Sequence, residues 1–415
     1  MRLLLPTCAK SSAITHPIIV PCRAPGGKVD GMIRTGIWFV AAPLALCACA
    51  SVPARHAAQP AAPYPSGRTI AAVSWLFPTG SARRRAIGSD LWPCTWAMDD
   101  DLYCAWGDGG GFDGNDDRIG RVSLGFARVH GTPGADGTGF QGKNVWGQLP
   151  YAQVQADFGG KVDSLIAVAG SLFAIGGFWT SANSADPAHH GEAGPLKALL
   201  RSDDGARSWS IVSTSAAFST GSFLDFGRDN RDGHGYVYIY YQRAGEADRF
   251  YLKRIREDRL AARAPRDSDL QYWQRAHRLI YSTIWSSREA DASPVFFDPR
   301  GVLTQFVVYD ARLDRYLLTI GHHPQGNAAT GSAGQIGLFE AAHPWGPWNT
   351  VGYYDDWDGI SARDDGDFLG LHIPSKWISA DGASFWAVFS DVGAYDAFNL
   401  VKGALSVRHR WWQIR

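Results

Sequence analysis

From residue 68 onward, short apolar segments rich in Val, Ile, Tyr, Phe and Trp alternate with turns rich in glycine, aspartate and asparagine. No stretch there carries the 3.6-residue apolar period of a long helix, so the pattern predicts an all-β chain. Strand–turn–strand segments recur about seventy residues apart, and they span residues 91–106, 163–179, 223–241, 302–320 and 376–390. This repetition predicts a single five-bladed β-propeller in which residues 68–77 pair with C-terminal strands to close the ring.

Two turns also resemble the Asp-box of sialidase-type propellers, S-x-D-x-G-x-x-W. Residues 202–209 read SDDGARSW and residues 379–386 read SADGASFW, both with alanine in place of one glycine of the motif. In an Asp-box the aspartate accepts hydrogen bonds from turn N–H groups and the tryptophan packs between blades. These degenerate copies therefore predict a role in folding, not in catalysis.

The stretch WGDGGGFDG, residues 106–114, matches the dinucleotide-binding pattern G-x-G-x-x-G. That pattern binds a pyrophosphate only between a strand and a following helix. Here the residues that follow, NDDRIGRVSLGFARV, predict a second strand, so we reject the nucleotide interpretation. We interpret the glycines as allowing close approach of a ligand and Asp108 as projecting into the mouth of a central funnel. The alternative is a glycine-rich turn with solvated aspartates.

The N-terminal region is predicted to direct export. Residues 1–31 show no targeting pattern, and we interpret them as a mis-assigned start before Met32. Residues 32–49, MIRTGIWFVAAPLALCAC, resemble a bacterial export signal of the lipoprotein type, too short to span a membrane, with Cys49 as the lipidated residue. We expect an outer-membrane or cell-surface lipoprotein, or otherwise a periplasmic or secreted protein. Residues 50–67 are rich in Pro and Ala and predict a tether, leaving 68–415 for the propeller.

The amino-acid composition limits the kinds of partner that we expect for this protein. Lys plus Arg and Asp plus Glu each number 40, so the formal net charge is zero. Without a basic run we expect no nucleic acid partner, and we expect a monomer that meets the membrane only through its lipid anchor. The chain has 17 Trp, 15 Tyr and 20 Phe, which suit both a large β fold and sugar stacking. Cys94 and Cys104 flank a predicted turn, which favours a cross-strand disulfide in an exported protein, with two buried thiols as the alternative.

Several segments resemble a bacterial family of five-bladed propellers related to endo-D-arabinanases, which hydrolyse arabinofuranose polymers. The segments occur in the order of that family between residues 68 and 407, and include DLWPCTWAMDDDLYCAWGDGGGF, RVSLGFARVHG, FGRDNRDGHGYVYIY, PVFFDPRGV, HPWGPWNTV and PSKWISADG. The resemblance implies a propeller and a glycoside hydrolase acting on a polysaccharide, an arabinan-like one among the candidates. The chain departs from the family at Asp163 and Ser164, where an aromatic residue and a glycine are more usual, and at Gly321, where an acidic residue often stands.

Glycoside hydrolysis uses two carboxyl groups that flank the scissile bond. Asp90 precedes the first strand of hairpin 91–106 and Asp108 follows its second strand, so both are predicted at the funnel and form the predicted catalytic pair. The alternative for Asp90 is a turn cap. Further candidates for substrate binding lie at equivalent strand ends or on inner strands. They are Trp92, Lys161, Trp179, Tyr241, Arg288, Glu289, His322, Lys376 and Asp396. The alternative for the aromatic residues on inner strands is that they belong to the hydrophobic core.

No metal site or cofactor is expected. The histidine pairs at 189–190 and 322–323 each point to opposite faces of a strand, so each pair supplies at most one ligand to a site. Residues 113–117, DGNDD, space oxygen ligands suitably for Ca²⁺ but lack a bidentate glutamate. Two other functions stay open. One is a polysaccharide lyase with Tyr241 or His322 as base and Lys161 or Arg288 as cation; the other is a carbohydrate-binding protein without chemistry.

Overall fold

The computed structural model describes residues 61–78, 84–113, 122–146, 158–180, 194–262, 265–275, 284–323, 335–357, 368–391 and 396–408. These residues belong to one compact unit, His56–Arg415. The predicted export signal with Cys49, the histidines at 189–190 and most of the DGNDD segment lie outside the described residues. Among the described residues, no helix is both long enough and apolar enough to cross a membrane.

The regular secondary structure of the described residues is almost entirely β, and hydrogen bonds group the strands into four sheets. One sheet contains β3 (Cys94–Trp96), β4 (Leu102–Gly107), β5 (Leu124–Gly131) and β6 (Phe140–Trp146). A second contains β7 (Phe158–Val168), β8 (Ser171–Thr180), β9 (Leu196–Ser202) and β10 (Ser210–Ser213).

The third sheet joins two strand groups. One group is β11 (Ser222–Asp225), β12 (Tyr236–Tyr241), β13 (Arg249–Arg256), β14 (Leu270–Gln274) and β15 (Ile284–Ser286), with β16 (Phe296–Phe297) on β13. The other is β17 (Thr304–Asp310), β18 (Arg315–Gly321), β19 (Ile336–Ala341) and β20 (Asn349–Tyr354). The first strands of the two groups, β11 and β17, pair in parallel.

The fourth sheet combines the two ends of the described chain. It contains β21 (Phe368–His372), β22 (Ser384–Asp391), β23 (Phe398–Val407) and β1 (Ile70–Leu76), with β2 (Arg84–Arg85) on β23. Strands β1 and β23 are antiparallel, from Ile70 opposite Val407 to Leu76 opposite Lys402. The prediction that residues 68–77 pair with C-terminal strands is therefore confirmed.

The helical elements are short. They are the α-helical turn α3 (Glu257–Leu260) and the 3₁₀ turns η3 (Arg228–Gly233), η4 (Asp267–Asp269), η5 (Glu289–Asp291) and η7 (Ser375–Trp377). They lie in connections between strands, so they do not form a layer of their own.

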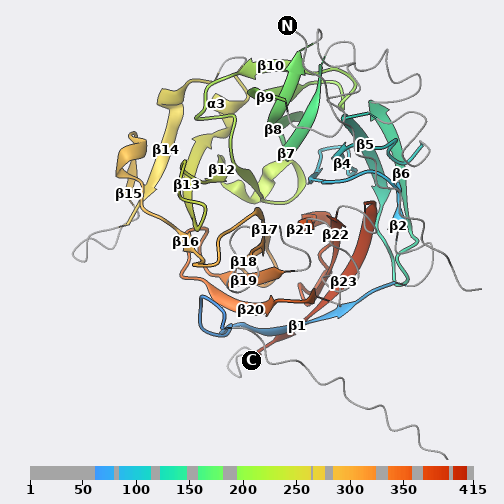
Figure 1. The fold of residues 1–415 in the computed structure, drawn as a ribbon, viewed down its shortest axis with the longest axis vertical. Helices are drawn as coiled ribbons and strands as arrows, with labels where there is room; N and C mark the ends of the chain where they lie inside the picture. Colours follow the sequence, from blue (N-terminus) through green and yellow to red (C-terminus); the bar gives the residue numbers. More distant parts are fainter. Residues whose placement is uncertain are drawn as a thin grey trace, which may run out of the picture. The chain divides into compact units, whose positions relative to one another are not determined.

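Figure 1 shows the strand groups arranged around a common centre, with β4, β7, β12, β17 and β21 on the inner side of the groups as labelled. This radial arrangement of antiparallel sheets is the architecture of a β-propeller. The first strands β3, β7, β11, β17 and β21 all begin on one face of the ring, which we call the loop face. Tight turns after these strands lie on the opposite face, which we call the turn face.

Four of the predicted hairpins correspond to β3–β4, β7–β8, β11–β12 and β17–β18. The fifth prediction, residues 376–390, is wrong in its first strand. Residues Ser375–Trp377 form the 3₁₀ turn η7 after Pro374, and the strand that pairs with β22 is β21, which begins at Phe368. The segment before residue 374 is rich in glycine and aspartate, which hid this inner strand.

One of the two Asp-box-like turns, residues 202–209, makes part of the contacts expected of that motif. Asp204 Oδ1 accepts hydrogen bonds from Arg207 N and Ser208 N at 3.0 and 2.9 Å, and Ser202 Oγ accepts one from Ala206 N. Trp209 stacks on a phenylalanine of the neighbouring sheet, with ring centroids 4.2 Å apart. These contacts fasten a turn and fill the space between two sheets, which is a folding role.

Cys94 and Cys104 lie directly opposite each other on β3 and β4 and form a disulfide. The bond lies in the core between this sheet and the sheet of β22 and β23, and both cysteines are buried. It therefore fixes the hairpin that carries the predicted catalytic residues at its other end.

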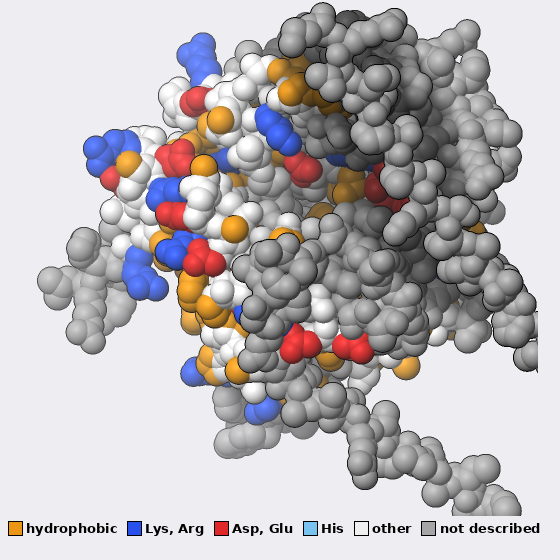
Figure 2. All heavy atoms as spheres, viewed as in Figure 1, with side chains coloured by type: hydrophobic (Ala, Val, Ile, Leu, Met, Phe, Trp, Pro, Cys, Tyr) orange, Lys and Arg blue, Asp and Glu red, His pale blue; other side chains and the backbone are white. Residues whose placement is uncertain are grey.

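Charge on the surface is mixed. Figure 2 shows Lys or Arg and Asp or Glu side chains interspersed on the described part of the visible face, without a continuous patch of one sign. This distribution agrees with the balanced composition of the chain.

Candidate active site on the loop face

The predicted pair Asp90 and Asp108 lies at the loop-face end of hairpin β3–β4. Asp90 forms an isolated antiparallel bridge with Gly107, through Asp90 N to Gly107 O at 2.7 Å and Gly107 N to Asp90 O at 3.0 Å. Asp108 follows at once, in the left-handed region with φ of 53°. Aspartate is among the residues that accept this conformation most readily. The bridge thus brings two carboxyl groups that are 18 positions apart in the sequence to one place.

Lys161, on the adjacent strand β7, joins the two carboxylates. Its Nζ lies 2.6 Å from Asp108 Oδ1 and 3.9 Å from Asp90 Oδ1. Since these two distances bound the third side of the triangle, the two oxygens are at most about 6.5 Å apart, the sum of 2.6 and 3.9. All three side chains are buried, with exposed fractions of 9% for Asp90, 7% for Asp108 and 7% for Lys161. The ammonium offsets the repulsion of two buried carboxylates at short range.

Gly107 leaves room for this trio. A Cβ on Gly107 would lie 2.4 Å from Asp90 Oδ1 and 2.7 Å from Lys161 Nζ. The neighbouring glycines serve packing within the protein: a Cβ on Gly109 would meet the carbonyl oxygen of Gly88 at 2.1 Å, and one on Gly111 would meet the Trp106 ring at 2.6 Å. Our interpretation that Gly109 and Gly111 admit a ligand is therefore wrong, because main chain and side chains of the same protein fill that space.

A pocket of about 250 Å³ opens beside the trio, among the first strands at the loop face. It is lined by the residue after Asp90, by the residues after Lys161, and by polar side chains of other strand groups, namely Leu91, Asp163, Ser222, Gln242, Thr304 and Gln305. Such a mixture of a few polar groups with apolar walls is common in small-molecule sites.

Asp163 is a pocket residue that the sequence analysis did not propose for the site. The register of β7 against β8 shifts between Val162 and Ser164, so Asp163 is the extra residue of a bulge, and it is solvent-accessible. The surrounding protein atoms raise its pKa, and the Lys197 ammonium partly opposes this. Its departure from the usual aromatic residue was the signal that could have identified it.

Three predicted substrate-binding residues are core residues, and those predictions are wrong. Trp92 is fully buried, with its ring stacked on Trp106. Tyr241 is 3% exposed among other aromatic rings, and burial raises the pKa of its hydroxyl. His322 is fully buried and stacked on Tyr353 with ring centroids 4.2 Å apart, and burial lowers its pKa. Each of these residues was predicted to bind substrate because of its place in the strand pattern, but its side chain packs inside the protein.

Two predicted residues lie near η5, on the outer part of another strand group. Arg288 is largely exposed and pairs with Asp291 at 2.5 Å, which raises the pKa of Arg288. Glu289 is half exposed and lies 3.8 Å from Arg243. Neither residue lines the pocket beside Asp90, so the structure does not bring them to the trio.

Lys376 lies on the turn face, where its Nζ bonds to the carbonyl oxygen of Asp100 in the β3–β4 turn. Its predicted place among the substrate-binding residues at the loop-face strand ends is wrong, because η7 follows the first strand β21 and does not precede it. Trp179 and Asp396 do lie on the loop face. Trp179 is half-buried and pairs with Gly159 of β7, and the carbonyl of Asp396 accepts a hydrogen bond from Gly88 N at 2.7 Å.

Within the described part of the chain, no group of three or more His, Cys, Asp or Glu side chains is arranged to hold a metal ion. The chemistry available at the loop face is therefore that of two adjoining carboxyl groups, one ammonium and a pocket with a further carboxyl group.

The chain matches no known protein family and no curated protein sequence. Similar solved structures include a β-xylosidase, at 10% identity over 80% of this chain and 94% of that chain, with a TM-score of 0.40. The α-L-arabinofuranosidase of Podospora anserina in complex with cellotriose has 11% identity over 80% and 94%, with a TM-score of 0.37. The GH62 α-L-arabinofuranosidase domain of Coprinopsis cinerea has 8% identity over 83% and 96%, with a TM-score of 0.39. Because these TM-scores are below 0.5, the likenesses assign neither family nor substrate.

Proposed function

We propose that the protein is a five-bladed β-propeller that hydrolyses glycosidic bonds in a polysaccharide, with Asp90 and Asp108 as its catalytic pair and an arabinan-like polymer as a candidate substrate. The observation that supports this proposal most directly is the convergence of both carboxylates on Lys161, next in sequence to Leu91 and Val162, which line the pocket on the loop face. The blade count follows from treating each strand group as one blade, with β1 completing the last one.

The separation of the carboxylates favours a retaining reaction. Retaining enzymes hold their carboxyl groups about 5–5.5 Å apart, whereas inverting enzymes need about 6.5–9.5 Å to admit a water molecule. The upper limit of about 6.5 Å between Asp90 Oδ1 and Asp108 Oδ1 lies at the short end of the inverting range and includes the whole retaining range. The products should therefore keep the anomeric configuration of the substrate.

The contacts with Lys161 suggest the division of roles. Asp108, with its oxygen 2.6 Å from the Lys161 ammonium, would attack the anomeric carbon. Asp90, at 3.9 Å, would protonate the leaving oxygen and later remove a proton from the attacking water. Lys161 would position both side chains.

A lyase is less well supported. Its two candidate bases, Tyr241 and His322, are both buried in the core. Both candidate cations are engaged by carboxylates, Lys161 by Asp90 and Asp108 and Arg288 by Asp291, so both are poorly suited to neutralise a uronate.

The test is product analysis on a panel of polysaccharides that includes arabinans and uronate polymers. A hydrolase yields new reducing ends only, a lyase also yields an ultraviolet-absorbing double bond, and a binding protein yields neither. Loss of product formation in Asp90→Asn, with binding retained, supports the proposal. Products with a double bond, or no products from any polymer, contradict it.

We also propose that the protein is exported and anchored by a lipid on Cys49. The support is the sequence pattern of residues 32–49. The cross-strand disulfide between Cys94 and Cys104 agrees with an oxidising compartment.

A further inference from the structure

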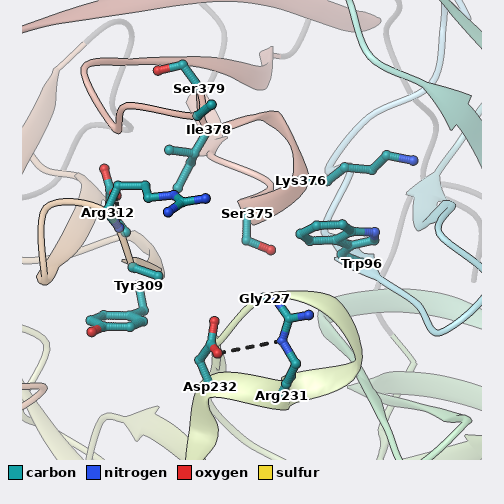
Figure 3. Close-up of a pocket in the computed structure, with 13 residues that line it drawn as sticks. Trp96, Gly227, Arg231, Asp232, Tyr309, Arg312, Ser375, Lys376, Ile378 and Ser379 are labelled. Atoms are coloured by element: carbon teal, nitrogen blue, oxygen red, sulfur yellow. Dashed lines mark hydrogen bonds and ion pairs between the residues drawn. The ribbon is translucent and has the colours of Figure 1, made fainter.

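A second pocket, of about 420 Å³, opens on the turn face of the ring (Figure 3). Its volume lies within the usual range of about 300–1,000 Å³ for ligand sites. Turns from several strand groups contribute to its walls, among them Trp96, Asp232, Tyr309, Asp310, Arg312 and Ser375. None of these residues takes part in the proposed hydrolysis.

The walls of this turn-face pocket are fastened to one another. Asp225, at the end of β11, accepts hydrogen bonds from Ser375 N at 3.0 Å, from Ser375 Oγ at 2.8 Å and from Gly227 N at 2.9 Å. These bonds tie the segment around η3 to η7. Lys376 ties η7 in turn to Asp100 of the β3–β4 turn. Because the walls are linked before a ligand arrives, binding costs little ordering of loops.

Asp310 has a buried polar atom that the protein does not satisfy. Its side chain is 1% exposed, and its Oδ1 accepts hydrogen bonds from Arg312 N at 2.9 Å and Leu313 N at 3.1 Å. Its Oδ2 has no hydrogen-bond partner among the described residues. Burial raises the pKa of Asp310 to about 6. A hydroxyl donor from a ligand would satisfy this oxygen, since a buried acceptor without a partner is costly.

The remaining groups suit a ligand rich in hydroxyls. Figure 3 shows the Arg312 side chain reaching towards Ser375, with Asp232 on the opposite wall and the Trp96 ring to one side. The guanidinium of Arg312 makes no hydrogen bond or ion pair with the part of the chain that the structure describes. Trp96 is half-buried and its ring is held in place by a 2.9 Å bond from Nε1 to Asp100 Oδ1. An aromatic face beside a guanidinium and carboxylates matches the apolar and polar sides of a sugar ring.

The charges of the pocket argue for a neutral ligand. Arg231 pairs with Asp232 at 3.7 Å, and Lys376 is engaged with Asp100. The cation of Arg312 and the carboxylates of Asp232 and Asp310 line the same pocket. A polyanion would meet both carboxylates at close range, whereas a neutral sugar can donate to them and accept from Arg312.

We propose that the turn-face pocket is a saccharide-binding site, in which hydroxyls of a neutral sugar bond to Asp310, Asp232 and Arg312 and one ring face packs on Trp96. Binding at this site does not require Asp90 or Asp108. A polysaccharide chain could therefore bind the protein at a second site that is separate from the cleavage site.

The test measures binding of neutral arabino- and xylo-oligosaccharides to the full chain by calorimetry and saturation-transfer NMR. The Asp108→Asn protein is used throughout so that no ligand is hydrolysed. We expect Arg312→Ala and Asp232→Asn each to weaken one binding event by about tenfold or more, the loss expected for a hydrogen bond to a charged group. Arg256→Ala, which changes an exposed arginine at the end of β13, is the matched control and should bind as before.

Unchanged affinity in both pocket variants overturns the proposal, and so does the absence of binding by every oligosaccharide. Circular dichroism confirms that the variants are folded, and Arg312 is exposed, so its replacement should not disturb the core. The hydrolase proposal is tested separately by product analysis. If the wild-type protein cleaves no polysaccharide while saccharide binding still depends on Arg312, only the hydrolase proposal is overturned.

Discussion

Replacing Asp108 by Asn separates a catalytic role from a structural one. Asparagine has nearly the same shape and tolerates the left-handed backbone at φ of 53°. The side-chain amide oxygen can still accept a hydrogen bond from Lys161, so the main loss is one negative charge 2.6 Å from the ammonium. Asp90 stays at 3.9 Å and continues to compensate Lys161.

The cost in stability can be worked from these contacts. Removing one partner of a buried ion pair costs about 3–5 kcal/mol when nothing replaces it. With Asp90 and the amide oxygen retained, we expect about 1–3 kcal/mol. A domain of about 350 residues unfolds with an entropy of roughly 0.7 kcal/mol/K, so this loss lowers Tm by about 1.5–4 °C. If Asp108 is the nucleophile, the same change should lower turnover by at least about a thousandfold, or about 4 kcal/mol in the barrier.

The assay measures release of reducing ends per folded molecule, with Tm measured on the same samples. Asp314→Asn is the matched control, because Asp314 also has a left-handed backbone, with φ of 52°, but lies in the β17–β18 turn on the turn face. It should leave turnover unchanged. If Asp108→Asn keeps its turnover within tenfold of wild type while its Tm falls, Asp108 is a structural aspartate and the catalytic reasoning is refuted.

Four further changes test other parts of the structure. Gly107→Ala should abolish turnover, since its Cβ would lie 2.4 Å from a carboxylate oxygen of the catalytic pair; an active variant would show that the geometry of the trio is unimportant. Reducing the Cys94–Cys104 disulfide should cost about 2–3 kcal/mol and lower Tm by about 3–4 °C, a shift that Cys94→Ser should reproduce without reductant. Burial lowers the pKa of His372 to about 3, so as the pH falls the unfolded chain binds a proton at this histidine before the folded chain does. The free energy of unfolding should therefore fall by about 1.4 kcal/mol for each pH unit as the pH is lowered from about 6.5 to about 3. Unfolding curves of His372→Gln should lack this part of the pH dependence. Cys49→Ser should move the protein from the membrane fraction to the soluble fraction, and equal retention of both forms would contradict the anchor.

The sequence predicted the strands better than the environment of individual side chains. The alternation of apolar and polar residues locates β4, β8, β12 and β18 because each pairs with a neighbour close in sequence. It missed β21, because the glycine- and aspartate-rich residues before this short strand resemble a loop and because its pairing depends on β22. A single sequence shows local periodicity, whereas strand pairing across a turn such as η7 is decided by packing.

The site was predictable where topology alone decides position. Asp90 and Asp108 meet because they bracket one hairpin, and Lys161 joins them because first strands begin on the same face. Which side chains are buried could not be predicted from the topology. Trp92 occupies a strand-end position like a ligand-stacking residue, yet the rings of Trp106 and Phe398 cover it.

The pairing of β1 with β23 has a consequence for synthesis. Their register joins Ile70 to Val407, so the ring cannot close until nearly the whole chain has left the ribosome. Pairings of such large sequence separation form late and slowly, because a long loop must be ordered first. Until then two sheet edges stay open at once, and both are templates for strands of other molecules. A stop codon before β23 should therefore yield aggregated protein, not a smaller folded one.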